Sequence, residues 1–251
     1  MVRCVISRPF VSDSGKMFLN HTILPEGTDD MGLFNWSAPL FRRFGDRWDD
    51  ETIERYRDWL APCMSPNGRL LDLGGGTGAL ARRLADALGT LVTVVDPTPE
   101  MVASMKPHPY VKAILGSAEC IPFDRHTFDG VIVSDAFHHF RDQDGAAREI
   151  ARVVKPGGCV LVLEFDRMGW MRFVVWGEQL LGEPGHFFAP DEACAFFARF
   201  GIEGECVREP HAPHKYYFLG RTASDGDAAV RSNGKRRTGK KPKQSDYACQ
   251  R

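Results

Sequence analysis

The chain has 251 residues, of which 43% are hydrophobic, and a formal net charge of −1. This length suits one α/β domain with tails and is too short for two domains of ordinary size. The charge is uneven, because residues 221–251 carry a net +6 and the preceding residues a net −7. Neither part has the composition of a dedicated nucleic-acid-binding protein.

Seven cysteines are scattered along the chain and form no C-x-x-C pair. This pattern favours reduced thiols in a cytoplasmic protein and argues against a zinc site. No apolar run approaches the roughly 20 residues that span a bilayer. The N-terminus also has no continuous hydrophobic segment after its first positive charge. We therefore expect a soluble, cytoplasmic protein without a bound metal.

The first part of the chain predicts little regular structure. Residues 1–30 mix Pro, Gly, Ser and Asp with short apolar pieces, which is typical of a loosely ordered extension. Residues 33–60 show an aromatic-rich helical pattern that is interrupted near Pro39 and Gly45. These aromatic side chains suit core packing, and they also suit the roof of a substrate pocket. A single domain is expected over residues 31–220.

The body of the chain alternates strands and helices. The expected strands are Arg69–Leu73, Leu91–Val95, Ala113–Leu115, Gly130–Ser134, Cys159–Phe165, Glu203–Arg208 and Lys215–Leu219. The expected helices are Ala79–Leu88, Pro99–Met105, Gly145–Val153 and Asp191–Arg199. This order predicts a doubly wound, mostly parallel seven-stranded sheet with helices on both faces.

A glycine-rich turn joins the first of these strands to its helix. Asp72 precedes Gly74, Gly76 and Gly78 in the segment from Leu70 to Leu80. Glycines let a ligand approach the backbone, and the helix start offers free N–H groups. The spacing Gly74-x-Gly76-x-x-Ala79 also fits a dinucleotide fingerprint. The glycines alone therefore leave both a nicotinamide cofactor and S-adenosylmethionine open.

Two carboxylates narrow this choice. Asp96 ends the next strand, eighteen residues after Gly78, where a carboxylate can accept hydrogen bonds from both hydroxyls of a ribose. Asp72 would repel a pyrophosphate, whereas it could accept from the ammonium of a methionine moiety. Together these positions favour S-adenosylmethionine over a dinucleotide.

Further motifs follow in a familiar order. They are Gly116 to Phe123, Thr127 to Ser134, Glu149 to Gly158 and Val160 to Phe165. With the glycine turn, they resemble the class I S-adenosylmethionine-dependent methyltransferases of the methyltransferase type 11 group, including the ubiquinone/menaquinone-biosynthesis C-methyltransferases. The resemblance runs from about Leu70 to Phe165. It implies a Rossmann-like fold with S-adenosylmethionine as the cofactor.

The resemblance also implies a set of cofactor contacts. They fall on Asp72, Gly74, Gly76, Thr77, Gly78, Asp96, Pro97, Met101, Ser117, Ala118 and Ser134. Thr77 would donate its hydroxyl near the methionine end, and the backbone N–H of Ala118 would face the adenine edge. Pro97 and Met101 would supply apolar surface against the base, although a methionine at this spacing also suits the core. Ser117 departs from the Asp or Asn of many relatives.

The segment after the fourth strand bears on the acceptor. It contains Asp135, His138 and His139, where the quinone-pathway enzymes carry a Gly-x-Arg-Asn type segment. This departure argues against a quinone acceptor. In-line methyl transfer needs a base only for a phenol, a carbon acid or a protonated amine, and histidine can act as a base near neutrality. These three residues are the catalytic candidates, while a histidine at this place also commonly only caps a helix or fills a gap.

The last predicted features are a lid and a tail. Residues 166–189 are rich in Trp, Phe and Met and form a lid-like insertion, a buried helix or an edge in contact with membrane lipid. Residues 221–251 predict a disordered basic tail.

The expected function is methyl transfer to a small, apolar or aromatic, lipid-like acceptor. A cofactor-binding regulatory protein without transfer activity is the main alternative. An NAD-type oxidoreductase stays open as a second, and a nucleic-acid methyltransferase, supported only by the tail, as a third. No nucleic-acid partner is expected, and the sequence does not indicate an oligomeric state.

Overall fold

The computed structural model describes residues 5–11, 17–23, 48–166, 186–209 and 212–224. It divides into two units, Met1–Gly45 and Asp46–Arg251. In the first unit, strand β1 (Val5–Val11) pairs antiparallel with strand β2 (Met17–Ile23). The sequence pattern gave no sign of these two strands. The division into an extension, a domain and a tail remains a prediction.

The second unit is built on a seven-stranded sheet with the order β5-β4-β3-β6-β7-β9-β8. The strands are β3 (Arg69–Leu73), β4 (Leu91–Asp96), β5 (Val111–Leu115), β6 (Phe128–Ser134), β7 (Val154–Phe165), β8 (Ile202–Glu209) and β9 (Ala212–Thr222). Strands β3 to β7 run parallel, and β9 runs antiparallel to both β7 and β8. The predicted mostly parallel sheet of seven strands is confirmed.

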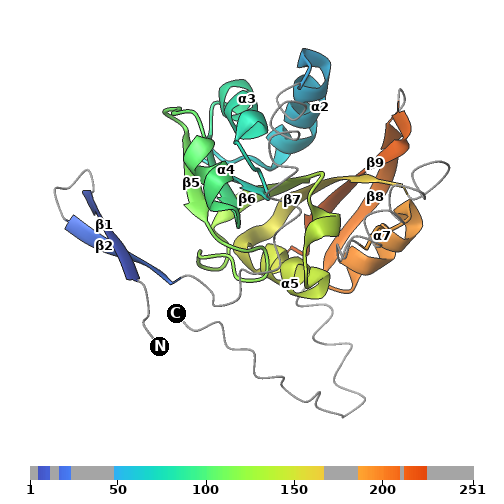
Figure 1. Cartoon of the computed structure of the whole chain (residues 1–251). Helices are drawn as coiled ribbons and strands as arrows, with labels where there is room; N and C mark the ends of the chain where they lie inside the picture. Colours follow the sequence, from blue (N-terminus) through green and yellow to red (C-terminus); the bar gives the residue numbers. More distant parts are fainter. Residues whose placement is uncertain (1–4, 12–16, 24–47, 167–185, 210–211, 225–251) are drawn as a thin grey trace, which may run out of the picture. The chain divides into compact units, whose positions relative to one another are not determined.

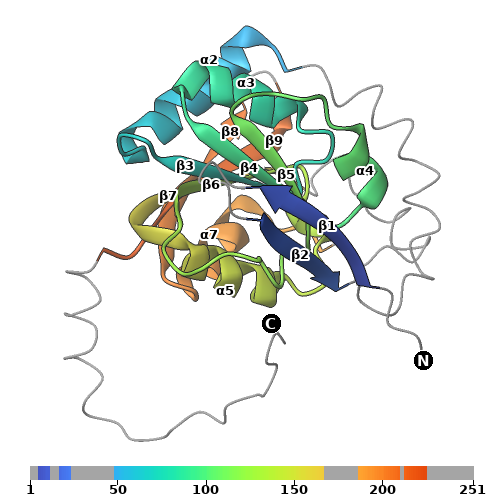
Figure 2. The same ribbon diagram turned by 90° about the vertical axis from the view of Figure 1, so that its left-hand side faces the viewer.

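Helices lie on both faces of this sheet. They are α2 (Asp50–Leu60), α3 (Ala79–Leu88), α4 (Pro99–Ser104), α5 (Gln143–Val153) and α7 (Pro190–Ala198), with short 3-10 turns η1 (Ala61–Cys63) and η2 (Phe137–His139). Figures 1 and 2 show α2 and α3 over one face, and α5 and α7 over the other. Helix α5 begins two residues before the predicted start, because the side chain of Asp142 caps it by accepting the N–H of Gly145 at 2.8 Å.

The two faces of the sheet carry separate hydrophobic clusters. Leu71 and Leu73 pack into the cluster that includes α5 and α7, whereas Leu70 packs into the cluster that includes α2 and α3. All three leucines are at most 1% exposed. Consecutive residues of a strand point to opposite faces, so a strand covered by helices on both sides reads as a continuous apolar run. Burial of each such side chain contributes about 1.5–3 kcal/mol.

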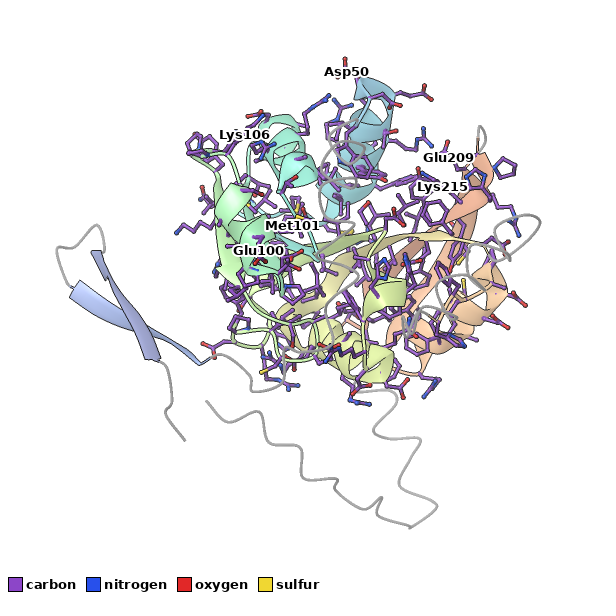
Figure 3. All side chains as sticks on the ribbon, viewed as in Figure 1. Asp50, Glu100, Met101, Lys106, Glu209 and Lys215 are labelled. Atoms are coloured by element: carbon purple, nitrogen blue, oxygen red, sulfur yellow. A yellow bond between two sulfur atoms is a disulfide. The ribbon has the colours of Figure 1, made fainter. Side chains whose placement is uncertain are left out.

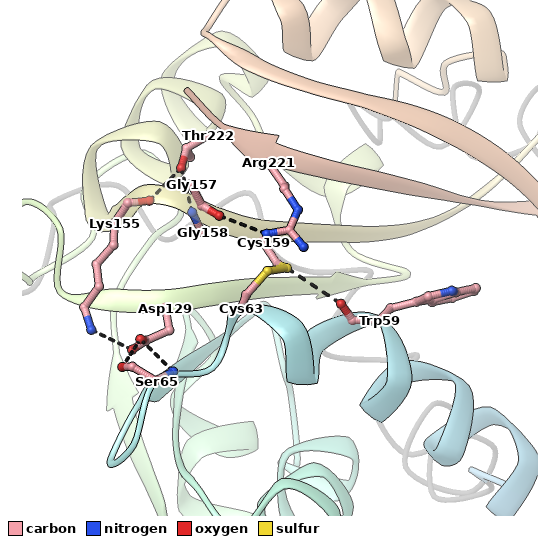
Figure 4. Close-up of a disulfide and its surroundings, with 10 residues drawn as sticks. All are labelled: Trp59, Cys63, Ser65, Asp129, Lys155, Gly157, Gly158, Cys159, Arg221 and Thr222. Carbon is pink, nitrogen blue, oxygen red and sulfur yellow. Dashed lines mark hydrogen bonds and ion pairs between the residues drawn. A yellow bond between two sulfur atoms is a disulfide. The ribbon is translucent and has the colours of Figure 1, made fainter. Parts of the chain in front are cut away.

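A disulfide joins the end of the first helix region to the sheet. Cys63 in η1 and Cys159 in β7 are bonded, with Cα atoms 5.8 Å apart (Figure 4). The expectation that all cysteines are reduced is therefore wrong for this pair. The two residues are 96 positions apart in the sequence. Cysteines so far apart form no local sequence pattern that predicts their pairing. Only the packing of η1 against β7 brings the two thiols together.

A buried carboxylate fixes the chain beside this disulfide. Asp129 accepts the backbone N–H of Ser65 at 3.2 Å and the ammonium of Lys155 at 2.8 Å (Figure 4). It also accepts the backbone N–H of Arg69 at 2.9 Å. Burial acts to raise the pKa of Asp129, but these donors lower it overall. The ionised side chain therefore holds the amino ends of β3, β6 and β7 together.

Some sequence predictions fall outside the described residues. They concern residues 167–185 of the lid, the helical pattern before residue 48 and most of the basic tail. Within the part of the chain that the structure describes, no helix combines the length and apolar character needed to cross a membrane.

Candidate functional site

Four polar side chains lie at the carboxyl ends of four neighbouring strands. Asp72 lies near the end of β3, Asp96 ends β4, Ser134 ends β6 and Glu164 lies near the end of β7. These strands are parallel and adjacent, so their ends meet at one edge of the sheet. Ligands of open α/β sheets bind beyond this edge.

The glycine turn after β3 lies at this edge of the sheet, and its backbone is packed closely against its neighbours at Gly74. Gly74 has a φ of +75°, and a Cβ built on it would lie 2.7 Å from the Cβ of Ala136. Its N–H donates to the carbonyl of Val95 at 2.7 Å. At Gly76, with a φ of +53°, a built Cβ would meet nothing within 4 Å. The turn is thus tightly packed at Gly74 and has open space at Gly76.

The turn continues into α3 at Thr77 and Gly78. Gly78 is the N-cap of α3 with a φ of 66°, and a Cβ built on it would lie 2.7 Å from the Sδ of Met105. The carbonyl of Thr77 accepts from Nη1 of Arg82 at 3.0 Å. Met105 was not predicted as a neighbour of this turn, because α3, β4 and α4 lie between them in the sequence.

Asp96 is a buried acceptor at the end of β4. Its Oδ2 accepts the N–H of Gly76 and its Oδ1 accepts the N–H of Thr98, each at 2.9 Å. Burial raises the pKa of Asp96, and these two hydrogen bonds act against the rise. Each carboxylate oxygen retains capacity for a further donor, such as a ribose hydroxyl. The contact with Thr98 was not predicted, although Asp side chains commonly accept the backbone N–H two residues further on.

Asp72 is more deeply buried and has a different environment. It is 1% exposed, and neither carboxylate oxygen has a hydrogen-bond partner among the described residues. Burial, and then the charge of Asp96, raise the pKa of Asp72 to about 7. A buried carboxylate without a partner is costly. The site therefore favours a ligand that brings a cationic donor to Asp72.

The residues expected beside an adenine ring surround the ends of β4 and β5. Pro97 is exposed, Ser117 is half-buried, and Met101 and Ala118 are 7% and 5% exposed. Met101 lies on α4 near Glu100, whereas Glu209 and Lys215 lie at the β8–β9 end of the sheet (Figure 3). The strand order places β4 and β5 at the opposite edge from β8.

The acceptor side begins with an unusual turn at Asp135. This residue is exposed and has a φ of +54°. Its N–H donates to the carbonyl of Leu163 at 3.0 Å. Non-glycine residues in the left-handed region are uncommon and cluster at functional sites. The turn carries the chain from β6 into η2 and sets Ala136 against Gly74.

His138 is clamped by Glu164. The Nδ1 atom of His138 lies 2.7 Å from Oε2 of Glu164, and the N–H of His138 donates to Oε1 at 3.1 Å. The two residues are 4% and 3% exposed. The ring of Phe187 stacks on the imidazole with centroids 4.2 Å apart and planes 20° apart. Glu164 was not among the residues predicted for the site.

His139 lies beside His138 in the same 3-10 turn. The two ring centroids are 3.9 Å apart, and His139 is half-buried. Burial, and then the charge of His138, lower the pKa of His139 to about 3. His139 is therefore neutral across the physiological range. The sequence could not distinguish the two histidines, because their different burial arises from β7 and Phe187.

Two buried hydroxyl groups lie behind the acceptor side. They belong to Ser134 and Tyr56, and the side chains of Ser134 and Tyr217 both influence the pKa of Tyr56. Tyr56 is fully buried on α2, and its ring packs edge-on against that of Tyr217 at 5.8 Å. Burial raises the pKa of Tyr56, so its phenol stays neutral. Tyr56 was not among the predicted site residues, and it was noted only as part of the aromatic pattern of residues 33–60.

Sequence comparison shows what this chain is similar to. Residues 71–162 match the methyltransferase domain family model. An uncharacterized methyltransferase of Mycobacterium tuberculosis is 43% identical over 148 residues, which are 57% of this chain and 58% of that protein. A demethylmenaquinone methyltransferase of Chlorobaculum tepidum is 38% identical over 148 residues, which cover 59% and 53% of the two chains. The match therefore spans little more than half of these relatives.

Solved structures share the fold at low sequence identity. A Haloferax volcanii methyltransferase, determined with its activator protein, matches with a TM-score of 0.63 at 20% identity, covering 76% of this chain and 97% of that chain. The cyclase SpnF matches with a TM-score of 0.60 at 16% identity, covering 77% and 95%. A cyclase among these structures means that the fold alone does not establish methyl transfer.

Proposed function

We propose that this chain is a class I S-adenosylmethionine-dependent methyltransferase that transfers a methyl group to a small-molecule acceptor and releases S-adenosylhomocysteine, and the match of residues 71–162 to the methyltransferase domain family model supports this proposal. The acceptor is apolar or aromatic and lipid-like. The aromatic side chains of Phe137, Phe187 and Phe188 near His138 support this part of the proposal.

The proposed cofactor rests mainly on the environment of the Asp72 carboxylate. Its buried carboxylate, without a hydrogen-bond partner among the described residues, suits the ammonium of a methionine moiety. Asp96 has capacity for ribose hydroxyls, and the open side of Gly76 leaves room beside the loop backbone. When bound, the cofactor supplies an electrophilic methyl carbon on a sulfonium centre.

The remaining cofactor contacts of the proposal follow the strand ends. Gly74, Gly76, Thr77 and Gly78 form the cradle, Ser134 lies at its β6 side, and the adenine lies among Pro97, Met101, Ser117 and Ala118. The doubly wound arrangement belongs to the same proposal. The strand order reverses between β3 and β6, and such a switch point is where ligands bind in open α/β sheets.

The catalytic part of the proposal rests on η2 and the turn before it. Asp135, His138 and His139 lie where an acceptor would approach from beyond β6. Methyl transfer needs alignment of the two reactants and exclusion of water, and a base where the acceptor must lose a proton. These side chains would orient the acceptor and take up its proton.

A cytoplasmic location is the last element of the proposal. The absence of a membrane-crossing helix among the described residues is compatible with it. A cytoplasmic location also requires that the Cys63–Cys159 disulfide resist reduction, because disulfides persist mainly under oxidising conditions.

Calorimetry and label transfer test this function. S-adenosylhomocysteine should bind the wild-type chain, and Asp96→Ala should weaken binding by at least tenfold, since a hydrogen bond to a charged group is worth about 1.5–3 kcal/mol. Incubation with methyl-labelled S-adenosylmethionine and a cell extract should place label in the small-molecule or lipid fraction. No binding by the wild type, or equal binding by Asp96→Ala, would refute the cofactor assignment. Label confined to nucleic acid would refute the acceptor class.

A further inference from the structure

We propose that Glu164 is a positioning residue that fixes the tautomer of His138 and so makes His138 the base for an acceptor with an O–H or C–H proton to lose. This inference rests on the proposed function, because it assigns the proton transfer of that reaction. It also selects one of the three catalytic candidates and narrows the acceptor to phenols, enols and activated carbon acids.

The hydrogen-bond pattern determines which imidazole nitrogen carries the proton. Both oxygens of Glu164 face His138, one towards Nδ1 at 2.7 Å and one towards the backbone N–H at 3.1 Å. An ionised carboxylate only accepts hydrogen bonds, so Nδ1 must be the donor. The neutral imidazole then has its lone pair on Nε2. A base held by a carboxylate in this way is oriented and its cationic form is stabilised.

The packing around His138 holds the imidazole in this orientation. Phe187 stacks on the ring at a centroid distance of 4.2 Å, and the ring of His139 lies 3.9 Å away. The backbone of η2 is itself held through the Glu164 contact. Rotation of the imidazole about its Cβ–Cγ bond would break the contact with Oε2. The ring edge that carries Nε2, opposite Glu164, therefore points in a fixed direction.

The other titratable groups described near His138 and Glu164 do not take the place of Glu164 as the partner of the imidazole. His139 stays neutral because burial, and then His138, lower its pKa to about 3. Tyr216 lies opposite Glu164 in the β7–β9 pairing, and burial, followed by Glu164, raises its pKa. Asp166 is fully buried and paired with Arg208 at 2.7 Å. Among the described residues, Glu164 is therefore the carboxylate that contacts the His138 ring.

The proposed step balances as a single displacement. The acceptor's O–H or C–H proton passes to Nε2 of His138, and the freed electron pair forms the new bond to the methyl carbon. The bond from that carbon to sulfur breaks, with its pair remaining on sulfur. The imidazolium later returns its proton to water. An amine that is already neutral or a thioether would not need this base.

The chain contains a matched control for the tautomer. His108 contacts Asp86 through Nε2 at 3.1 Å, and its Nδ1 accepts the N–H of Tyr110 at 3.2 Å. This geometry requires the opposite tautomer, with the proton on Nε2. The Asp86 side chain is 71% exposed, whereas that of Glu164 is 4% exposed. One protein thus holds two histidine–carboxylate pairs with opposite expected protonation patterns.

Nitrogen NMR of the full chain, with histidine labelled with ¹⁵N and S-adenosylhomocysteine added, tests the positioning role. His138 should show the Nδ1–H tautomer and His108 the Nε2–H tautomer, with His138→Gln identifying the resonance. Glu164→Gln should move the protonation midpoint of His138 down by at least one pH unit, while Asp86→Asn should leave it in place. An Nε2–H tautomer for His138, or a midpoint that Glu164→Gln does not move, overturns the assignment.

Label transfer tests the acceptor class separately. Methyl-labelled S-adenosylmethionine is offered with a phenol, an enolisable ketone, a neutral primary amine and a thioether. Label should enter the phenol or the ketone, and Glu164→Gln should lower kcat at least tenfold with KM unchanged. Absence of label from both compounds, or an equal kcat in the variant, overturns the acceptor class. Calorimetry with S-adenosylhomocysteine runs alongside, so loss of cofactor binding by the wild type identifies a failure of the proposed function instead.

Discussion

The carboxylate of Asp96 accepts the backbone N–H of Gly76 at 2.9 Å, across twenty positions of sequence. This bond ties the glycine turn after β3 to the end of β4. It also brings Asp96 near the buried Asp72, whose pKa it helps to raise. Two carboxylates at one turn make the affinity for a cationic ligand depend on pH.

Cofactor binding should strengthen as pH rises towards neutrality. Burial and Asp96 raise the pKa of Asp72 to about 7, so much of the protein carries a neutral Asp72 at pH 6. A ligand ammonium favours the ionised carboxylate and so displaces its proton. If only the ionised form binds, the affinity for S-adenosylhomocysteine rises roughly tenfold from pH 6 to pH 7.5. Calorimetry in buffers of different ionisation enthalpy measures both the affinity and the released proton.

The control for this pH dependence comes from two asparagine variants. Asp72→Asn should bind more weakly at pH 7.5 and show a flat profile. Asp86→Asn, whose side chain is 71% exposed on α3, should keep the wild-type slope. A slope that persists in Asp72→Asn would assign the titration to another group.

Asp72 should also make the ligand-free protein less stable at higher pH. Its pKa is about 7 in the folded protein and about 3.9 in the unfolded chain, so the folded state binds the proton more tightly between these values. The resulting stability is present below pH 4 and is lost as pH rises through 7. Between pH 5 and pH 8 this loss is about 3 kcal/mol.

Urea unfolding of wild type and Asp72→Asn at several pH values measures this effect. Between pH 5 and pH 8, the free energy of unfolding of wild type should fall by about 3 kcal/mol relative to that of Asp72→Asn. Asp58→Asn, with a side chain 67% exposed, should run parallel to wild type. A constant difference between wild type and Asp72→Asn would contradict the raised pKa.

Local sequence patterns predicted the elements that depend on local chemistry. The bounds of β3 and α3 match the prediction at every residue, because an apolar run, a glycine turn and a helical pattern follow one another directly. The same continuity identified Asp72, and Asp96 followed from the end of the next strand. These residues are positioned by their own strand and its adjoining turn.

Contacts between distant strands could not be predicted in this way. Glu164 and His138 are 26 positions apart and meet because β6 and β7 pair in parallel. Cys63 and Cys159 meet only when η1 packs against β7. A clamped histidine or a disulfide partner depends on this register and packing, for which a single sequence carries no local signal.

Gly74 should not tolerate even the smallest side chain. In Gly74→Ala the new Cβ would lie 2.7 Å from the Cβ of Ala136, in a backbone with a φ of +75°. Gly89→Ala is a matched control, because Gly89 also has a positive φ of 61° but a Cβ there meets nothing within 4 Å. The control should lose about 1–2 kcal/mol from the left-handed conformation alone.

Gly74→Ala should lose more free energy of unfolding than the Gly89→Ala control. It should also bind S-adenosylhomocysteine at least tenfold more weakly. The additional loss reflects movement of the turn away from η2. Urea unfolding and calorimetry on both variants separate the two effects. Equal stability and equal binding in the two variants would show that the contact with Ala136 has no consequence.

The Cys63–Cys159 disulfide should contribute several kcal/mol of stability. It closes a loop across 96 positions, and the loss of unfolded-chain entropy for a loop of about 100 residues is worth roughly 4.7 kcal/mol in the chain-entropy model. Each single alanine variant removes the whole bond. Cys159→Ala should cost slightly more than Cys63→Ala, because Cys159 is 6% exposed and leaves a small cavity.

A double-mutant cycle isolates the bond from these packing effects. Once Cys63→Ala has removed the disulfide, adding Cys159→Ala should cost only the cavity, so the two changes should be strongly non-additive in urea unfolding. Peptide mapping without reductant should recover Cys63 linked to Cys159. Additive losses, or recovery of both thiols free, would contradict the bond. Because η1 follows directly from α2, loss of the bond should also weaken the packing of Tyr56 and Leu60 against the sheet.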